Sequence, residues 1–355
     1  MKGKKVVIMA GGTGGHVYPA LAVANELRAR GVEIHWLGNE NGFEGQKVPA
    51  AGHRFWHFAV AGVRGRSKWQ LPFMLLRALW RSRRILKEIK PDLMLAFGGF
   101  TGLAGFWRQA PLVVHEQNAV AGLANRWLAR WARLVLLGDR RAVAAMEKIN
   151  GHCLYTGNPV RADISALPEP AERFRDRHGP LRLLVIGGSQ GAQALNQLIP
   201  ETLALVPEGQ RPAVRHQVGQ RNWAEAQARY GQLGVSGQVL PFIDDMAEAY
   251  GWADWIICRA GAATVAEVAT VGLAALFVPY PYATDNHQYY NGLSLASSGG
   301  AEVIEQKDLS AAGLAELIRD KRRPELLRRA ELLRRHSHRD ALKNIITALE
   351  PLLKP

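Results

Sequence analysis

A glycine-rich loop that directly follows a run of apolar residues is the most constraining feature of this chain. Residues 6–19 read VVIMAGGTGGHVYP, so a short apolar run gives way to four glycines, a threonine and a histidine. A buried parallel strand requires such a run, and glycines after it let backbone N–H groups approach an anion at the next helix. The stretch therefore predicts a strand, a phosphate-type loop and a helix that begins near Pro19 and ends around Gly31.

The loop does not match the common nucleotide-binding fingerprints. Gly12 and Gly14 occupy the first two positions of G-x-G-x-x-G, but Val17 stands at the third, and no Walker lysine follows. A tight turn that only needs glycine is the structural alternative. His16 favours a functional loop, because an imidazole among glycines at a helix start lies where an anionic substrate binds. A lone histidine is also common as a capping residue, so both roles stay open for His16.

The excess of positive charge is confined to the N-terminal half. The 355 residues carry a formal net charge of +14, and 48% of them are hydrophobic. Residues 1–160 hold 23 Lys and Arg against 9 Asp and Glu, whereas residues 161–355 hold 22 against 22. The length suffices for two domains, and a basic half indicates an anionic partner such as a membrane, a nucleic acid or a polyanion.

The sequence predicts neither disulfides nor a membrane-spanning segment. Cys153 and Cys258 are too few and too far apart for a disulfide framework or a zinc site, and they indicate buried thiols in a reducing compartment. The first apolar run is too short for a signal peptide. The longest uncharged run, residues 268–284, is interrupted by glycine and prolines.

Residues 60–90 combine nine basic residues with aromatic side chains. On a helical projection one side is apolar, whereas the other places aromatic and aliphatic side chains among arginines. Such a face is typical of a protein that rests on an anionic membrane. Packing under a neighbouring helix is one alternative, and nucleic acid is another, which we rank lower because no recognisable motif accompanies it. The predicted membrane face comprises Trp69, Phe73, Leu76, Trp80, Arg77 and Arg84.

Polar residues and glycines follow two further predicted strands. Residues 92–97 lead into the glycines at 98 and 99, and residues 112–114 lead into His115, Glu116, Gln117 and Asn118. Open α/β sheets bind ligands at the carboxyl ends of their strands. Glu116 with His115 or His16 is therefore a candidate base with an orienting partner, and an ordinary polar loop is the alternative.

The second half repeats the pattern of strand, glycine loop and helix. Residues 181–186 precede GGSQGA, and the turn-rich TGNPVR at 156–161 with the prolines that follow marks a linker. We therefore expect domains at 1–162 and 163–340, with 341–355 as a terminal helix. Two such halves predict an α/β protein of two domains, with a cleft between them that grips a diphosphate.

The residues after 255–258 have the composition of a nucleotide site. Arg259 and Thr264 suit an anion, small residues allow close approach at a helix start, and Glu267 can accept both hydroxyls of a ribose. An ordinary helix start explains the alanines but not the whole set.

In combination, these segments resemble the MurG family along nearly the whole chain. That family comprises the bacterial N-acetylglucosaminyltransferases that convert undecaprenyl-diphospho-muramoyl-pentapeptide (lipid I) to lipid II. The resemblance implies a GT-B fold, in which two Rossmann-like domains face each other across a cleft and the C-terminal helix packs back on the first domain. Seven motifs carry it in order: MAGGTGGHVYPALAVA, VVHEQNAVAGLANRWLA, TGNPVR, GGSQGA, FIDDMAEAY, WAD and CRAGAATVAEV.

The resemblance also implies which residues meet the substrates. His16 matches the residue proposed as base or acceptor contact, and Glu116 is its candidate assistant. The acceptor diphosphate would face Gly11, Gly12, Gly98, Gly99 and Phe100. The donor UDP-GlcNAc would be held, together with Arg259, by Thr13, Gly14, Gly15, Asn118, Arg161, Ser189, Ile243, Ala262, Ala263, Thr264, Val265, Ala266, Glu267 and Gln288.

The implied activity is an inverting glycosyl transfer on the cytoplasmic face of the bacterial inner membrane, by a peripheral protein. The implied partners are UDP-GlcNAc, lipid I, an anionic membrane surface and other cell-wall synthesis and division proteins, with no nucleic acid. No cofactor and no obligatory metal is expected, because no carboxylate pair of metal-binding type accompanies the nucleotide motif. A UDP-GlcNAc 2-epimerase is the closest enzymatic alternative, and a non-catalytic membrane or nucleic-acid binding module is the other.

Two positions depart from the family pattern. Thr101, Gly102 and Leu103 follow Phe100 where a Ser-Gly-Pro-like segment is usual, and Ala274 stands where a proline is expected. The first departure weakens the expected acceptor contacts of this loop, and the second affects only the entry to a strand.

Overall fold

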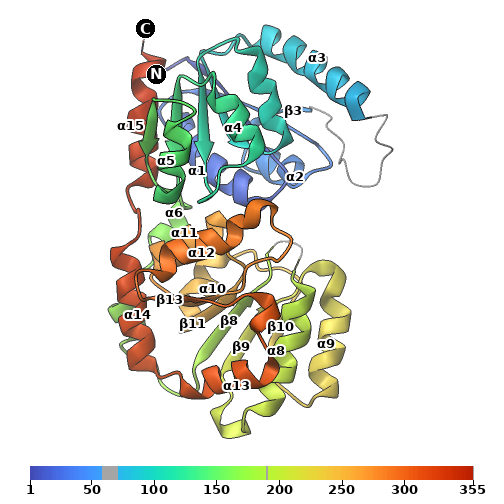
Figure 1. Cartoon of the computed structure of the whole chain (residues 1–355), viewed down its shortest axis with the longest axis vertical. Helices are drawn as coiled ribbons and strands as arrows, with labels where there is room; N and C mark the ends of the chain where they lie inside the picture. The colour runs from blue at the N-terminus through green and yellow to red at the C-terminus, as the bar shows by residue number, and fades with distance from the viewer. Residues whose placement is uncertain (58–70, 189–190, 355) are drawn as a thin grey trace. The chain divides into compact units, whose positions relative to one another are not determined.

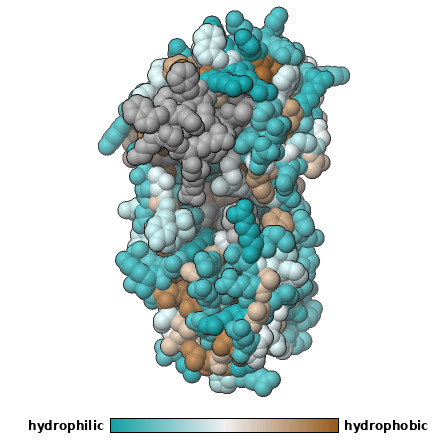
Figure 2. Space-filling view, turned by 90° about the vertical axis from the view of Figure 1, so that its right-hand side faces the viewer, coloured by the Kyte–Doolittle hydropathy of each residue, from teal (hydrophilic) through white to brown (hydrophobic). Residues whose placement is uncertain are grey.

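The computed structural model describes residues 1–57, 71–188 and 191–354, which fall into two compact units. Unit 1 contains residues 1–161 and 339–355, and unit 2 contains residues 162–338 (Figure 1). On the face drawn in Figure 2, hydrophilic residues predominate and hydrophobic ones form small separate patches. Among the described residues, none of the helices combines the length and the hydropathy of a membrane-spanning segment.

In its described part, unit 1 contains one seven-stranded parallel sheet in the order β3-β2-β1-β4-β5-β6-β7. The order changes direction between β1 and β4, which makes this pair the topological switch point of the sheet. The strands are β1 (Lys5–Ala10), β2 (Glu33–Gly38), β3 (Arg54–His57), β4 (Leu93–Gly98), β5 (Leu112–Glu116), β6 (Leu134–Leu137) and β7 (Cys153–Tyr155).

Helices cover both faces of this sheet. One hydrophobic cluster lies between the sheet, α1 and α15, and a second lies on the other face with α3, α4 and α5. The helices are α1 (Gly14–Ala29), α2 (Phe43–Ala50), α3 (Leu71–Ile89), α4 (Leu123–Ala129), α5 (Val143–Glu147) and α15 (Ala341–Leu353), with the 3₁₀ turns η1 (Phe100–Trp107) and η2 (Arg140–Ala142).

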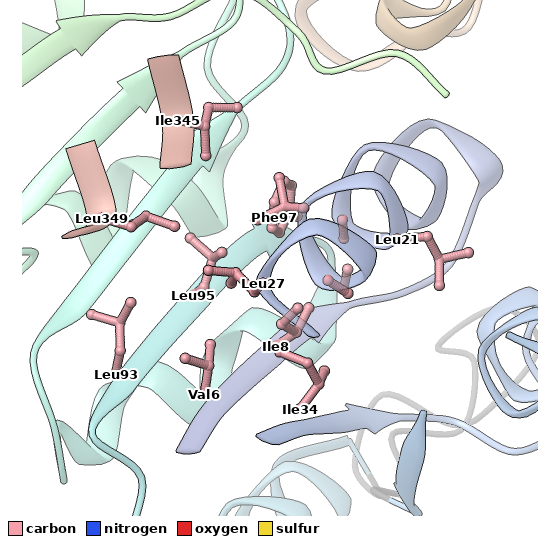
Figure 3. Packing of buried hydrophobic residues seen from close by; sticks show 14 of the residues in the cluster. Val6, Ile8, Leu21, Leu27, Ile34, Leu93, Leu95, Phe97, Ile345 and Leu349 are labelled. Carbon is pink, nitrogen blue, oxygen red and sulfur yellow. The ribbon is translucent and has the colours of Figure 1, made fainter. Parts of the chain in front are cut away.

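The last helix belongs to the first unit. Figure 1 shows α15 in red beside the blue and green elements of unit 1, and in Figure 3 Ile345 and Leu349 lie over Leu95 of β4. Both side chains are fully buried, and burial of one such side chain stabilises the fold by roughly 1.5–3 kcal/mol. An ion pair of 2.8 Å between Arg30 and Glu350 adds a link to α1.

Unit 2 contains, in its described part, a six-stranded parallel sheet in the order β10-β9-β8-β11-β12-β13. Its switch point lies between β8 and β11, by the same reasoning as for unit 1. The strands are β8 (Arg182–Ile186), β9 (Ala213–Gln217), β10 (Gln238–Leu240), β11 (Trp255–Cys258), β12 (Ala274–Phe277) and β13 (Ala301–Val303).

The helices of unit 2 enclose a core of its own. They are α6 (Ala162–Ser165), α7 (Pro170–Phe174), α8 (Gln193–Leu205), α9 (Trp223–Gln232), α10 (Met246–Trp252), α11 (Ala262–Val271), α12 (His287–Ala296), α13 (Ala311–Asp320) and α14 (Arg323–Arg335). Short 3₁₀ turns lie between them: η3 (Glu208–Gln210), η4 (Gln220–Asn222), η5 (Thr284–Asn286) and η6 (Gln306–Asp308).

Two local predictions need correction. The first helix begins at Gly14, with Thr13 as its N-cap, so Pro19 lies inside the helix and not at its start. The backbone N–H groups of His16 and Val17 already bond to Thr13 O, which places the histidine in the first turn. His115 and Glu116 lie inside β5 and are buried, whereas the sequence predicted that they follow the strand.

Candidate active site

Two glycine loops meet at the switch point of unit 1. The first follows β1 and the second follows β4, where Gly98 and Gly99 have φ values of +99° and +74°. A Cβ on Gly99 would lie 2.7 Å from Gly11 O, so only glycine permits this approach. The two loops predicted to bind the acceptor therefore lie side by side where doubly wound sheets bind ligands. Phe100, at the start of η1, is exposed.

His16 points from the first turn of α1 into this loop pair. Its Nδ1 lies 3.2 Å from Gly11 O. A carbonyl oxygen only accepts hydrogen bonds, so Nδ1 donates and the neutral ring carries its lone pair on Nε2. A Cβ on Gly98 would lie 3.2 Å from that Nε2. The second glycine loop thus runs directly past the nitrogen that is able to accept a proton.

Glu116 organises the loop after β5. Its carboxylate is buried and accepts from the backbone N–H and Nδ2 of Asn118 at 2.9 and 3.0 Å, from the N–H of Gly122 at 2.9 Å and from Asn125 Nδ2 at 2.8 Å. A carboxylate with four such donors and almost no exposed surface holds the loop in place. Through these bonds Glu116 positions Asn118 and Asn125, and its predicted assistance to the base stays a prediction.

His115 has a structural role. Its Nε2 lies 3.3 Å from Gly157 O and its Nδ1 lies 3.1 Å from Gln117 Nε2, while Asn158 donates to Gln117 O at 2.9 Å. Burial lowers the pKa of His115 to about 4, so the ring is neutral at physiological pH. These bonds tie the HEQN and TGNPVR motifs together. Of the two histidines that the sequence left open, His16 is the one at the glycine loops.

Glu44 is a residue that the sequence analysis missed. It lies in the first turn of α2, is only 2% exposed, and accepts from the N–H groups of Gly12 at 3.1 Å and Asn39 at 3.0 Å. A Cβ on Gly11 would lie 2.6 Å from its carboxylate. The N–H of Gly12, predicted to face the acceptor diphosphate, is therefore bonded to a carboxylate of the protein. A single acid without a spacing pattern gave no signal for this role.

The glycine loop of unit 2 follows β8. Gly188 and Gly191 have φ values of +90° and +74°, and a Cβ on Gly191 would lie 1.9 Å from Val218 O. Only glycine fits at that position. Ser189, predicted to bind the donor, lies outside the described residues, and the flanking Gly188 O accepts from Gln217 Nε2 at 3.0 Å.

The first turn of α11 lies at the switch point of unit 2. Gly261 is its N-cap, Ala262 is buried, and Ala263, Thr264, Val265 and Ala266 are partly exposed. Glu267 is largely buried, and its Oε2 accepts from Tyr250 Oη at 2.9 Å. A partly exposed helix start with a fixed carboxylate one turn later suits a nucleoside diphosphate.

Arg259 differs from its predicted role. Its buried guanidinium donates to Val278 O and Pro279 O, both at 3.0 Å, and to Gln306 Oε1 at 2.7 Å. Burial lowers the pKa of Arg259, but the group stays cationic at neutral pH. The side chain therefore braces the loop after β12, and its predicted part in holding the donor stays a prediction.

The remaining predicted donor residues lie in loops and in the first turn of α12. Ile243 lies between β10 and α10 and is partly exposed, and Gln288 Oε1 accepts from the N–H of Tyr280 at 3.0 Å. Asp285 and Asn286 adopt positive φ values of 52° and 50°, an uncommon conformation that often marks ligand sites. Arg161 belongs to unit 1, with its guanidinium 4.8 Å from the ring centre of Tyr18.

An aromatic surface connects α3, η1 and α4 of unit 1. Leu76 and Trp80 are 54% and 57% exposed, as the projection predicted, and Phe106, Trp127 and Trp131 are exposed beyond them. Successive ring centres are 5.8–6.4 Å apart from Trp80 to Trp127. Trp69 and the side chain of Phe73 lie outside the described residues. We call this set the aromatic surface: Leu76, Trp80, Phe106, Trp107, Trp127 and Trp131.

Cations accompany the aromatic surface. Arg83 lies 5.7 Å from the ring centre of Trp80 and 5.1 Å from that of Trp107, and Arg130 lies 5.0 Å from that of Trp127. Arg77 and Arg84 are exposed on α3. Within residues 1–57, 71–188 and 191–354, no three His, Cys, Asp or Glu side chains converge as a metal site.

Comparison with known proteins identifies the chain's relatives. Residues 6–137 match the glycosyltransferase family 28 N-terminal domain, and residues 182–345 match the C-terminal domain of the same family. A protein of Dichelobacter nodosus named UDP-N-acetylglucosamine–N-acetylmuramyl-(pentapeptide) pyrophosphoryl-undecaprenol N-acetylglucosamine transferase is 49% identical, over 100% of this chain and 99% of its own. The crystal structure of Acinetobacter baumannii MurG is 35% identical, with a TM-score of 0.78 over 98% of this chain and 99% of its own. This chain belongs to the MurG family.

Membership of the MurG family confirms the resemblance and the GT-B fold that the sequence predicted, with two Rossmann-like units built on parallel sheets. A protein of Bordetella petrii with the same transferase name is 47% identical, over 99% of this chain and 98% of its own. Because these full-length relatives are named as transferases, the epimerase alternative is not favoured.

Proposed function

We propose that this chain transfers N-acetylglucosamine from UDP-GlcNAc to the C4 hydroxyl of the muramoyl sugar of lipid I, which gives lipid II for peptidoglycan synthesis. The observation that carries the proposal is full-length identity of 49% and 47% to two proteins named for a transfer to N-acetylmuramyl-(pentapeptide) pyrophosphoryl-undecaprenol. A glycine loop at the switch point of each sheet supports it, because each substrate carries a diphosphate.

The transfer is a single inverting displacement. The C4 oxygen forms a bond with the anomeric carbon from the face opposite UDP, the bond between that carbon and the diphosphate oxygen breaks, and UDP leaves as an anion. The proton of the hydroxyl goes to His16 Nε2, because the bond from Nδ1 to Gly11 O leaves the lone pair of the neutral ring on Nε2. Glu116 acts indirectly, through the loop that it holds.

Unit 2 binds the donor. Backbone N–H groups at the loop after β8 and at the first turn of α11 stabilise the charge that develops on UDP. The hydroxyl of Thr264 donates a further hydrogen bond to this charge. Glu267 accepts from the ribose hydroxyls, and the backbone at Ile243 meets the uracil. Because these groups are fixed by the fold before the substrate arrives, no reorganisation is needed during the reaction.

Unit 1 binds the acceptor and a membrane. The glycine loops with Gly11, Gly12, Gly98 and Gly99 face the acceptor diphosphate, and the aromatic surface rests on anionic lipid. Exposed tryptophans bury their rings at the headgroup boundary while arginines beside them pair with phosphates. We place the protein at the cytoplasmic face of the bacterial inner membrane as a peripheral protein. Other cell-wall synthesis and division proteins are further proposed partners, on the family resemblance alone.

The assay that tests the proposal measures UDP release with a soluble lipid I analogue, beside a control without acceptor. Acceptor-dependent release is the expected result, and it should persist in excess EDTA because no metal is required for it. Conversion of UDP-GlcNAc to its C2 epimer in the acceptor-free control would support epimerase chemistry instead. No UDP release together with salt-sensitive RNA binding would support a binding module.

A further inference from the structure

We propose that Tyr250 is a positioning residue for nucleotide recognition, whose phenol fixes the carboxylate of Glu267 for the ribose. The inference rests on the proposed function, in which Glu267 accepts from the ribose hydroxyls of UDP-GlcNAc. It adds a residue that belongs to none of the predicted sites.

The contact is a buried hydrogen bond to a charged group. Tyr250 Oη donates to Glu267 Oε2 at 2.9 Å, the tyrosine is 1% exposed and the glutamate 9%. A hydrogen bond to an ionised group in a buried site is roughly twice as strong as a neutral one. The phenol therefore holds the carboxylate in one orientation, so the ribose meets a group that is ordered before binding.

The same bond joins two segments that the nucleotide must touch together. Tyr250 lies on α10, which follows the loop with Ile243 that is proposed to meet the uracil, whereas Glu267 lies on α11. Uracil and ribose are covalently linked at a fixed distance. The position of α10 relative to α11 therefore decides whether one nucleotide reaches both contacts.

Hydrogen bonds from Arg173 also link α10 to α11. Arg173 Nη2 donates to Val271 O at 2.8 Å and to Gly272 O at 2.5 Å at the end of α11, and its Nη1 makes a long bond of 3.5 Å to Tyr250 O. Burial lowers the pKa of Arg173 to about 10, so the guanidinium stays charged at neutral pH. A cation is favourable at helix C-termini. Arg173 thus fixes the helix ends, and the phenol of Tyr250 fixes the carboxylate.

Tyr250→Phe removes the hydroxyl and keeps the buried ring. Tyr230→Phe is the matched control, because Tyr230 is also a buried tyrosine of unit 2 and its Oη lies 3.0 Å from His216 Nδ1, in a different part of the sheet. Calorimetry should measure the Kd of UDP and of 2′,3′-dideoxy-UDP for the wild type and both variants. The dideoxy nucleotide lacks both hydroxyls that Glu267 is proposed to bind.

We expect Tyr250→Phe to raise the Kd of UDP by about tenfold, which is the effect of one hydrogen bond to a charged group. The Kd of the dideoxy nucleotide should rise by less than about twofold. Tyr230→Phe should bind both nucleotides as the wild type does. The inference would be overturned if Tyr250→Phe raised the Kd of both nucleotides equally or left the Kd of UDP unchanged. It would also be overturned if Tyr230→Phe changed the Kd of UDP as much as Tyr250→Phe does. If the wild type binds no UDP, the proposed function fails and this inference fails with it.

Discussion

At the scale of single residues, the chemistry of unit 1 depends on one hydrogen bond. The donation from His16 Nδ1 to Gly11 O selects the tautomer whose Nε2 is able to take a proton. The carboxylate of Glu116, the other predicted catalytic group, already accepts four hydrogen bonds, three from the loop after β5 and one from Asn125 of α4. In the proposed mechanism, the imidazole of His16 therefore takes the proton of the acceptor hydroxyl.

His16→Ala should lower turnover by ~10²–10⁴-fold, the usual contribution of a general base, and leave the Kd of UDP-GlcNAc nearly unchanged because His16 is not among the predicted donor contacts. Steady-state kinetics and calorimetry check the two parts separately. His152→Ala, at an exposed histidine of unit 1, serves as the control and should behave as the wild type. Unchanged turnover in His16→Ala would remove this residue from the role of base.

Glu44→Gln should raise the KM for the acceptor and leave the Kd of UDP unchanged. The amide offers one acceptor oxygen in place of two, so either Gly12 N or Asn39 N loses its partner and the first glycine loop loosens. The free energy of unfolding should fall by about 1–3 kcal/mol. Glu40→Gln, at an exposed acid of the segment between β2 and α2, is the control. An acceptor KM equal to that of the wild type would show that the loop does not depend on Glu44.

At the scale of elements, the loops at the strand ends of unit 1 need glycine for two reasons, which are a positive φ and the close approach of another group. Gly98 has a positive φ, and a Cβ there would lie 3.2 Å from His16 Nε2. Gly98→Ala should therefore strain the loop and displace the base, and turnover should fall by about 10–100-fold. Gly151→Ala is the control, because a Cβ there has nothing within 4 Å. Normal turnover in Gly98→Ala would contradict the proposed place of the second loop.

The aromatic surface makes a prediction at the same scale. The double change Trp80→Ser and Trp127→Ser should weaken binding to vesicles that contain anionic lipid by about tenfold or more, because two exposed rings no longer enter the interface. The melting temperature should stay near that of the wild type, since both rings are more than half exposed. Leu205→Ser, at an exposed leucine of unit 2, is the control. Unchanged vesicle binding would place the membrane contact elsewhere.

The sequence predicted elements well where one local signal dominates. The strands β1, β8 and β11 lie at the apolar runs that predicted them. The start of α1 was missed because Pro19 suits a first turn, whereas Thr13, six residues before Pro19, supplies the N-cap. The end of β5 was missed because His115 and Glu116 are polar, and only their partners in the folded chain explain their burial.

At the scale of the whole molecule, buried histidines in both units make stability depend on pH. Burial lowers the pKa of His53 and His115 to about 4 and that of His216 to about 3. The unfolded chain binds protons near pH 6.5, before these folded groups do, so stability is fully present above pH 6.5 and is lost as the pH falls toward 4.

Each of these histidines should therefore cost up to about 2 kcal/mol of the free energy of unfolding at pH 5. Urea unfolding at pH 7 and pH 5 measures the difference. His216→Asn should reduce the pH dependence of unit 2, whereas His178→Asn, at an exposed histidine, should not. Equal unfolding midpoints at the two pH values would contradict the expected protonation of the unfolded chain.

The family and the GT-B fold were predictable because several motifs occur in order along the chain. Roles that depend on side-chain direction were not. From the sequence Arg259 is interpreted as an anion ligand, whereas in the structure it donates to the loop after β12. No signal in the sequence indicated Glu44, which holds the first glycine loop through the N–H of Gly12. No spacing rule reports which way such a side chain points, because tertiary packing decides it.

The most direct measurement of the central claim is the structure of the product made from ¹³C-labelled UDP-GlcNAc and a soluble lipid I analogue. Mass spectrometry and NMR should show one labelled sugar per acceptor, joined by a β linkage to the C4 oxygen of the muramoyl sugar, with one UDP released for each transfer. A labelled free sugar without transfer, or an α linkage to the acceptor, would contradict the account of an inverting transferase.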